Sequence, residues 1–166
     1  MMQKAMTDHS TTSPPALAVA PRLLMIDNNQ GDLELIRIAF EEAAIRVDLV
    51  LAGSGRAGLA ALERVVAGID PPYLLTLLDL NMPGHNGHDV LLWARAQPAL
   101  ATAPIVILSS SGSACDRRSC LAEGATDVLV KPPTFSAVIA LVEGLRTYLN
   151  PDPARIDGSG AAAILT

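Results

Sequence analysis

The sequence predicts a doubly wound α/β fold, in which a parallel sheet is covered by helices on both faces. Five short apolar runs alternate with five segments of helical character along the chain, an order that is typical of repeated βα units. Half of the 166 residues are hydrophobic, but only 3% are aromatic. The core must therefore be built from Leu, Val, Ile and Ala, a composition that suits helices packed on a buried sheet.

The apolar runs predict strands at residues 23–26, 47–52, 73–78, 105–108 and 128–130. The first run, Leu23-Leu24-Met25-Ile26, is stopped by Asp27-Asn28-Asn29. A short continuous apolar run that ends in polar residues is typical of a strand buried on both faces.

The segments between and after the strands predict helices at residues 32–44, 56–67, 88–96, 113–123 and 135–149. In the first of these, Leu33, Ile36 and Phe40 recur at three- and four-residue steps, which indicates one apolar face. Strict alternation of strands and helices implies right-handed crossovers. In such sheets the functional crevice lies at the carboxyl ends of the strands, so polar residues at those ends are the candidates for function.

The chain is predicted to form one domain over residues 21–150, with a tail on either side. Residues 1–20 contain the pair Pro14-Pro15 and no periodic pattern, which indicates a flexible N-terminal tail. Residues 151–166 combine a Gly- and Ser-containing stretch with a short apolar end, Ala161 to Leu165. We interpret them as a flexible tail or as a dimerisation arm that docks on a second subunit.

Charge and hydropathy limit the possible partners. The net charge of −5 and the absence of a long basic stretch argue against nucleic-acid binding. No apolar run approaches the roughly 20 residues that span a bilayer, and the first residues lack the apolar core of a signal peptide. We therefore expect a cytoplasmic protein with no membrane partner. The pair Arg117-Arg118 is interpreted as a solvated helix face, and His85 and His88 as exposed loop histidines.

Polar residues follow four of the predicted strands. Asp27 and Asn28 come after the first strand, Asp79 after the third, Ser109 after the fourth and Lys131 after the fifth. Any one aspartate there could simply cap a helix or begin a turn. Four parallel strands that all end in such residues point instead to one shared cleft.

These residue types suit phosphoryl transfer. A carboxylate can attack a phosphoryl group only if the charge on the transferred oxygens is neutralised. Asp27, Asp79 and the backbone carbonyl of Asn81 would supply oxygen ligands to Mg²⁺, which binds one or two carboxylates and keeps several waters. Lys131 would place a positive charge on one phosphoryl oxygen. The Ser109 hydroxyl would donate a hydrogen bond to another oxygen once the phosphoryl group is present.

The segment after the third strand carries a more specific motif. Asp79-Leu80-Asn81-Met82-Pro83 with Gly87 resembles the D-x-x-M-P-x-x-x-G signature of response-regulator receiver domains. The resemblance extends over about residues 22–150. It implies a flavodoxin-like (βα)5 sandwich whose five-stranded parallel sheet has the order 2-1-3-4-5.

The resemblance also implies roles for the strand-end residues. Asp79 would be the phosphoacceptor, Asp27 an acidic-pocket residue, Ser109 the switch hydroxyl, and Lys131 a lysine followed by a cis peptide bond to Pro132. The chain resembles the small regulators paired with bacterial phytochrome kinases. This resemblance rests on the stretches 27–32 and 78–83 and on the expected absence of an output domain. The expected partner is therefore a sensor histidine kinase, with a bacterial phytochrome as the candidate.

Two positions depart from the family pattern. Receiver domains usually have a second acid where this chain has Asn28, so Mg²⁺ binding should be weaker, although an amide oxygen can still ligate the ion. The family's switch aromatic lies three residues before the lysine, and here that residue is Val128. An inward-moving aromatic ring therefore cannot be the readout in this protein.

The sequence therefore predicts a single-domain response regulator of a two-component phosphorelay, a signalling protein that catalyses only its own phosphotransfer and dephosphorylation. It would signal by protein contact and form a homodimer through its apolar final helix and residues 163–165. One alternative is a pseudo-receiver, a protein-interaction module independent of phosphorylation, which Asn28 and Val128 would favour. Another is a hydrolase of small phosphate esters with Asp79 as nucleophile, although the sequence offers neither a substrate cap nor a general base.

Overall fold

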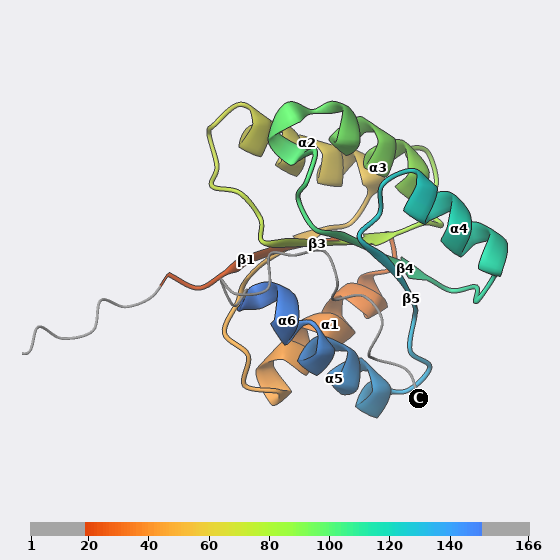
Figure 1. Ribbon diagram of the computed structural model, residues 1–166. Coiled ribbons are helices and arrows are strands. Elements are labelled where there is room, and N and C mark those ends of the chain that lie inside the picture. Colours follow the sequence, from red (N-terminus) through yellow and green to blue (C-terminus); the bar gives the residue numbers. More distant parts are fainter. Residues whose placement is uncertain (1–18, 151–166) are drawn as a thin grey trace, which may run out of the picture.

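The computed structural model describes residues 19–150, which form a three-layer α/β sandwich (Figure 1). The sheet has five parallel strands in the order β2-β1-β3-β4-β5, which confirms the predicted fold class. The strands are β1 (Arg22–Ile26), β2 (Asp48–Ala52), β3 (Leu75–Asp79), β4 (Ile105–Ser109) and β5 (Asp127–Val130). The helices are α1 (Gln30–Glu42), α2 (Gly55–Val66), α3 (Gly87–Ala96), α4 (Ala114–Ala122), α5 (Phe135–Gly144) and α6 (Arg146–Leu149), and a 3-10 turn, η1 (Pro98–Leu100), precedes β4.

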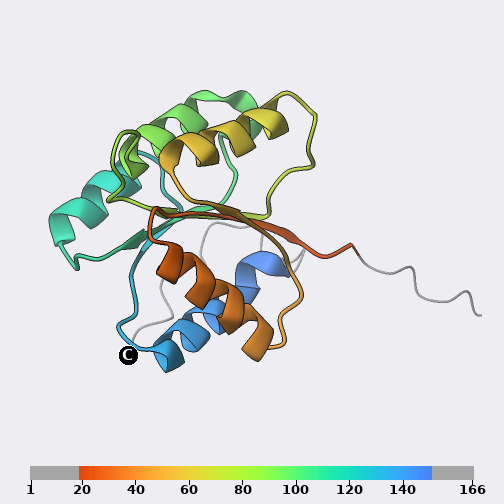
Figure 2. The ribbon, with the colours of Figure 1, turned by 180° about the vertical axis from the view of Figure 1, so that it is seen from behind.

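The two faces of the sheet bury separate apolar clusters. Helices α2, α3 and α4 cover one face, and α1, α5 and α6 cover the other, as the two opposite views show (Figures 1 and 2). Along β1, Leu24 and Ile26 belong to the first cluster, whereas Leu23 and Met25 belong to the second. Side chains on a strand alternate between faces, so the central strands are apolar at most positions, with Thr76, Asp79 and Ser109 as the buried polar exceptions. This explains why they read as continuous apolar runs.

Two predicted helix boundaries are wrong, for local reasons. Helix α1 begins at Gln30 and not at 32, because the Asn29 side chain caps it by accepting from the backbone N–H of Gly31 and of Asp32. The single helix expected at 135–149 is two helices, α5 and α6, which meet at Leu145. Glycine weakens a helix interior, and Gly144 lies where the long helix would have continued.

The loop between β3 and α3 depends on one close approach. A Cβ atom on Gly87 would lie 2.4 Å from the carbonyl oxygen of Asp79 and 2.7 Å from Cα of Leu80. Only glycine fits there, and its N–H donates to the Leu80 carbonyl at 3.0 Å. Gly87 thereby holds the start of α3 against the end of β3, next to the polar residues that follow the strands.

In the part of the chain that the structure describes, every helix is too short or too polar to cross a membrane. The expected arm or tail at 151–166, and most of the expected N-terminal tail, lie outside the described residues.

Candidate functional site

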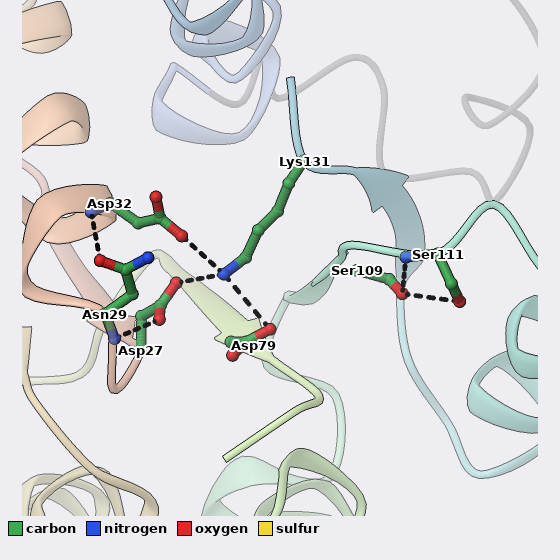
Figure 3. Close-up of polar contacts among 7 residues, drawn as sticks. All are labelled: Asp27, Asn29, Asp32, Asp79, Ser109, Ser111 and Lys131. Atoms are coloured by element: carbon green, nitrogen blue, oxygen red, sulfur yellow. Dashed lines mark hydrogen bonds and ion pairs between the residues drawn. The ribbon is translucent and has the colours of Figure 1, made fainter. Parts of the chain in front are cut away.

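Four of the predicted site residues lie together at the carboxyl edge of the sheet (Figure 3). Asp27 directly follows β1, Asp79 and Ser109 end β3 and β4, and Lys131 directly follows β5. Asp27, Asp79 and Ser109 are 0%, 4% and 1% exposed. Parallel strands end at the same edge of a sheet, so the fold brings together residues that lie up to 104 positions apart.

The Lys131 ammonium group lies at the centre of this cluster. Its Nζ atom donates hydrogen bonds to Asp27 Oδ2 at 2.7 Å and to Asp32 Oδ2 at 2.9 Å. It also forms an ion pair with Asp79 Oδ1 at 3.4 Å. One cation therefore faces three carboxylates, and the cluster keeps an excess of negative charge.

The two buried aspartates differ in how their oxygens are satisfied. Asp27 Oδ1 accepts from the backbone N–H of Asn29 at 2.8 Å, and Oδ2 accepts from Lys131. Asp79 Oδ1 is buried and accepts no hydrogen bond, because its contact with Lys131 is an ion pair without hydrogen-bond alignment. A buried acceptor without a hydrogen bond is costly and uncommon in folded proteins. This oxygen is therefore poised to take a new partner.

Burial and ion pairing shift the pKa values of Asp27 and Lys131, and both are raised. Burial raises the pKa of Asp27 above its usual value, although the hydrogen bonds from Lys131 and Asn29 oppose the change. Burial also acts to lower the pKa of Lys131, but the hydrogen bonds to Asp27 and Asp32, together with the charges of Asp27 and Asp79, outweigh burial, so this pKa is raised. The lysine is therefore charged at neutral pH.

Ser109 connects the cluster to helix α4. Its Oγ accepts from the Ser111 N–H at 3.2 Å and lies 3.5 Å from Ser111 Oγ. Ser111 Oγ in turn donates to Asp116 Oδ2 at 2.7 Å, in the first turn of α4. A hydroxyl that turned toward a new group at Asp79 would disturb this chain of contacts.

A cleft of about 270 Å³ opens beside these residues. The residues that line it come from β4, from the loop after β3 and from the first turns of α3 and α4: Leu80, Asn81, Met82, Asn86, His88, Ser109 and Asp116. Asn81 thus lies on the cleft wall with Ser109. Asn28, by contrast, is solvent-exposed.

The carboxylate oxygens fit a hard cation such as Mg²⁺. Within residues 19–150, no group of three or more Asp, Glu, His or Cys side chains is arranged to hold a metal. Mg²⁺ does not require such a cage, because it binds through one or two carboxylates and retains water. Asp27 and Asp79 supply this number, and Asp79 Oδ1 has no hydrogen bond to give up.

The family model for the response regulator receiver domain matches residues 23–143. The chain belongs to the response regulator receiver family. It is 29% identical over 126 residues to the probable methanogenesis regulatory protein FilR2 of Methanothrix harundinacea, covering 76% of this chain and 81% of that protein. It is 32% identical to the Escherichia coli transcriptional regulatory protein HprR over 73% of this chain, but this match spans only 49% of HprR.

Solved receivers from light-signalling systems have the same fold. The phosphorylated cyanobacterial phytochrome response regulator RcpA is 25% identical, with a TM-score of 0.70 over 79% of this chain and 94% of that chain. The bacteriophytochrome response regulator RtBRR is 28% identical, with a TM-score of 0.64 over 76% of this chain and 78% of that chain. The receiver family and its likeness to phytochrome-associated regulators are therefore confirmed.

Asp32 is a site residue of this receiver that sequence reasoning missed. It was expected at the start of the helix predicted at residues 32–44 and was given no role in the site. The structure places it in the first turn of α1, in contact with Lys131. Its position was a usable signal, because the first turn of a helix that follows β1 lies at the same edge of the sheet as Asp27.

Two of the outlying predictions are wrong. His88 is not an exposed loop residue but part of α3, and its Nδ1 lies 2.6 Å from Glu123 Oε2 at the end of α4. Arg117 is solvent-exposed on α4, as predicted, and it also donates to Asp127 Oδ1 at 2.9 Å and to the Val128 carbonyl, which ties α4 to β5. The described residues contain no cis peptide bond, so the bond before Pro132 is trans.

Proposed function

We propose that this receiver accepts a phosphoryl group from a sensor histidine kinase on Asp79 and signals the change by protein contact. The observation that supports this role is the state of Asp79 Oδ1, a buried carboxylate oxygen with no hydrogen bond and with the Lys131 ammonium 3.4 Å away. Such an oxygen is a nucleophile with charge compensation nearby.

The transfer exchanges one bond for another. An Asp79 oxygen attacks the phosphorus of a phosphohistidine, the new O–P bond forms, and the P–N bond breaks with its electron pair going to the imidazole. Lys131 Nζ neutralises charge on one phosphoryl oxygen, and the Ser109 hydroxyl donates to another. In the separate dephosphorylation step, water attacks the phosphorus, the bond between the phosphorus and the Asp79 oxygen breaks, and the Asp79 carboxylate is restored with release of inorganic phosphate.

A divalent cation completes this proposal. Mg²⁺ would be held by Asp27, Asp79 and the Asn81 carbonyl, with the Asn28 amide as a weaker candidate, and when bound it would offset the negative charge of the phosphoryl oxygens. Because Asn28 carries no charge, this site has one carboxylate fewer than the family pattern. We therefore expect half-saturation at a higher Mg²⁺ concentration in wild type than in an Asn28→Asp variant.

The signal would leave through the surface formed by α4, β5 and α5. Leu121, Val130 and Phe135 are exposed apolar side chains on these three elements. They support contact with a partner protein or with a second copy in a homodimer. We further propose residues 21–150 as the receiver unit and 151–166 as a dimerisation arm. A chain truncated after Asn150 should then lose dimerisation in light scattering, and an unchanged dimer would exclude the arm.

Intact-mass analysis tests the central step. The protein is incubated with acetyl phosphate and Mg²⁺, and wild type is compared with Asp79→Asn and with an EDTA-treated sample. We expect one phosphoryl adduct in metal-containing wild type only. Asp48→Asn, which removes an exposed carboxylate on β2, is the matched control and should still form the adduct.

The same experiment also tests the alternative, a pseudo-receiver. Folded wild type that forms no adduct, even with a purified candidate kinase such as a bacterial phytochrome, would leave a pseudo-receiver that acts only as an interaction module. An adduct that persists in Asp79→Asn would place the acceptor elsewhere.

A further inference from the structure

The Lys131 ammonium is held toward α1 and away from Asp79. Its two hydrogen bonds go to Asp27 and Asp32, at 2.7 and 2.9 Å. Both carboxylates lie on the side of Nζ opposite to Asp79 (Figure 3). The third contact, to Asp79 Oδ1, is longer at 3.4 Å and is not a hydrogen bond. Both hydrogen bonds of Lys131 are therefore made on the α1 side of the cluster.

The two carboxylates hold the lysine unequally. Asp27 is fully buried, and its other oxygen is fixed by the Asn29 N–H, so it would be left without compensation if Lys131 moved away. Asp32 has a side chain that is 31% exposed. It also lies in the first turn of α1, where water and the positive end of the helix dipole would stabilise its charge without the lysine. Asp32 is therefore the partner that Lys131 can release at lower cost.

We propose that Asp32 is a positioning residue, which holds Lys131 on the α1 side in the unmodified protein and is exchanged for a phosphoryl oxygen when Asp79 is phosphorylated. An ammonium group has three donors, so Lys131 can keep Asp27 while it replaces Asp32. The Asp32 contact then stabilises the unmodified state relative to the phosphorylated one. This proposal rests on the proposed function of Asp79.

The kinetic test uses Asp32→Asn, which keeps the size of the side chain but weakens its hold on the ammonium, because neutral acceptors bind less strongly than charged ones. The rate of adduct formation with acetyl phosphate and Mg²⁺ should rise about fivefold over wild type. A hydrogen bond to a charged acceptor is roughly twice as strong as one to a neutral acceptor, and the difference of about 1 kcal/mol corresponds to about fivefold in rate. Glu34→Gln is the matched control. It removes a charge from the same helix at a residue that bonds Arg37 and not Lys131, and its rate should match wild type.

A double-mutant cycle separates positioning by contact from a general loss of negative charge. If Asp32 acts through Lys131, Asp32→Asn should change the rate in wild type but not in a Lys131→Met background. An equal acceleration in both backgrounds, or in Glu34→Gln, would overturn the proposal. Asp32→Glu, which restores the charge, should return the rate toward that of wild type.

An NMR measurement tests the contact whether or not the protein can be phosphorylated. The Lys131 ammonium protons of wild type should exchange with water slowly, because Asp27 and Asp32 hold them, and exchange should be faster in Asp32→Asn but not in Glu34→Gln. Unchanged exchange in Asp32→Asn would refute the positioning role. Wild type that shows the slow exchange but forms no adduct on Asp79 would refute the proposed function while retaining the contact.

Discussion

At the scale of single residues, Lys131 is the only positive group among the contacts recorded for Asp27 and Asp79 in the described structure. Removing one partner of a buried charge cluster is costly, because the remaining charges lose their compensation and cannot regain water. The same substitution at an exposed pair costs little, since solvent replaces the lost partner. This contrast allows the energetic role of Lys131 to be measured separately from phosphorylation.

We predict that Lys131→Met lowers the free energy of unfolding by about 3 kcal/mol at neutral pH. Urea denaturation in the absence of divalent metal measures this quantity. Arg64→Met, which removes the cation of the exposed pair with Asp70, is the control and should cost less than about 1 kcal/mol. Equal losses in the two variants would show that the buried aspartates do not depend on the lysine.

Asp27 should also give stability an unusual pH dependence. Burial raises its pKa above the ordinary value of 3.8, so the folded state binds this proton more tightly than the unfolded state does. Its contribution to the free energy of unfolding is therefore complete below about pH 3.8 and declines as the pH rises through the raised folded-state pKa.

The measurement is the free energy of unfolding of wild type and of Asp27→Asn in EDTA, at intervals from about pH 4 to pH 7. The free energy of unfolding of wild type minus that of Asp27→Asn should decrease as the pH rises across this range. A difference that stays constant, or that grows in favour of wild type, would mean that ion pairing and not burial controls the titration of Asp27.

At the scale of the elements, the site depends on the close packing of the start of α3 against the end of β3. Gly87 has no space for a side chain, because a Cβ atom there would meet the backbone of Asp79 and Leu80. Backbone atoms cannot rotate away as a flexible side chain can, so relief would require the loop to move. The position of Asp79 and the stability of the domain are therefore linked through this residue.

We predict that Gly87→Ala lowers the free energy of unfolding by about 2 kcal/mol or more and slows formation of the Asp79 adduct. Gly144→Ala is the matched control, since nothing lies within 4 Å of a Cβ placed there, and alanine favours the helix by up to about 1 kcal/mol. Thermal unfolding and intact-mass kinetics measure both variants. A Gly87→Ala protein with wild-type stability would show that the loop adjusts freely.

At the scale of the whole molecule, the sheet joins two apolar clusters into one cooperative unit. Adjacent side chains of β3 lie on opposite faces of the sheet. Leu77 packs toward α1 and α5, whereas Leu78 packs toward α2 and α3. Neither cluster can lose its sheet face without exposing the other. The two layers should therefore unfold together.

We predict that Leu77→Ala and Leu78→Ala each cost about 2–5 kcal/mol, and that each variant still unfolds in one transition. Trp93, the single tryptophan, packs against the cluster that contains Leu78. Its fluorescence reports one face, while circular dichroism reports all helices. Coincident curves for both probes in both variants are expected, and separate transitions would contradict a single cooperative unit.

Much of the fold follows from local patterns. Continuous apolar runs gave the five strands, and their alternation with helices gave a parallel sheet, because both signals are set by neighbouring residues. Helix ends were less predictable. The start of α1 depended on the Asn29 cap, and the break at Leu145 interrupted an apolar stripe that itself continued to Leu149.

The sequence by itself determined the α/β order, the strand ends at Asp27, Asp79, Ser109 and Lys131, and the motif that marks the family. These are statements about residue type and spacing along the chain. Only the tertiary structure decided which side chains meet. The contact of Asp32 with Lys131 joins residues 99 positions apart, and the ties of His88 and Arg117 to neighbouring elements likewise depend on how helices lie across the sheet. Contact geometry at such separations is set by packing, which no local pattern encodes.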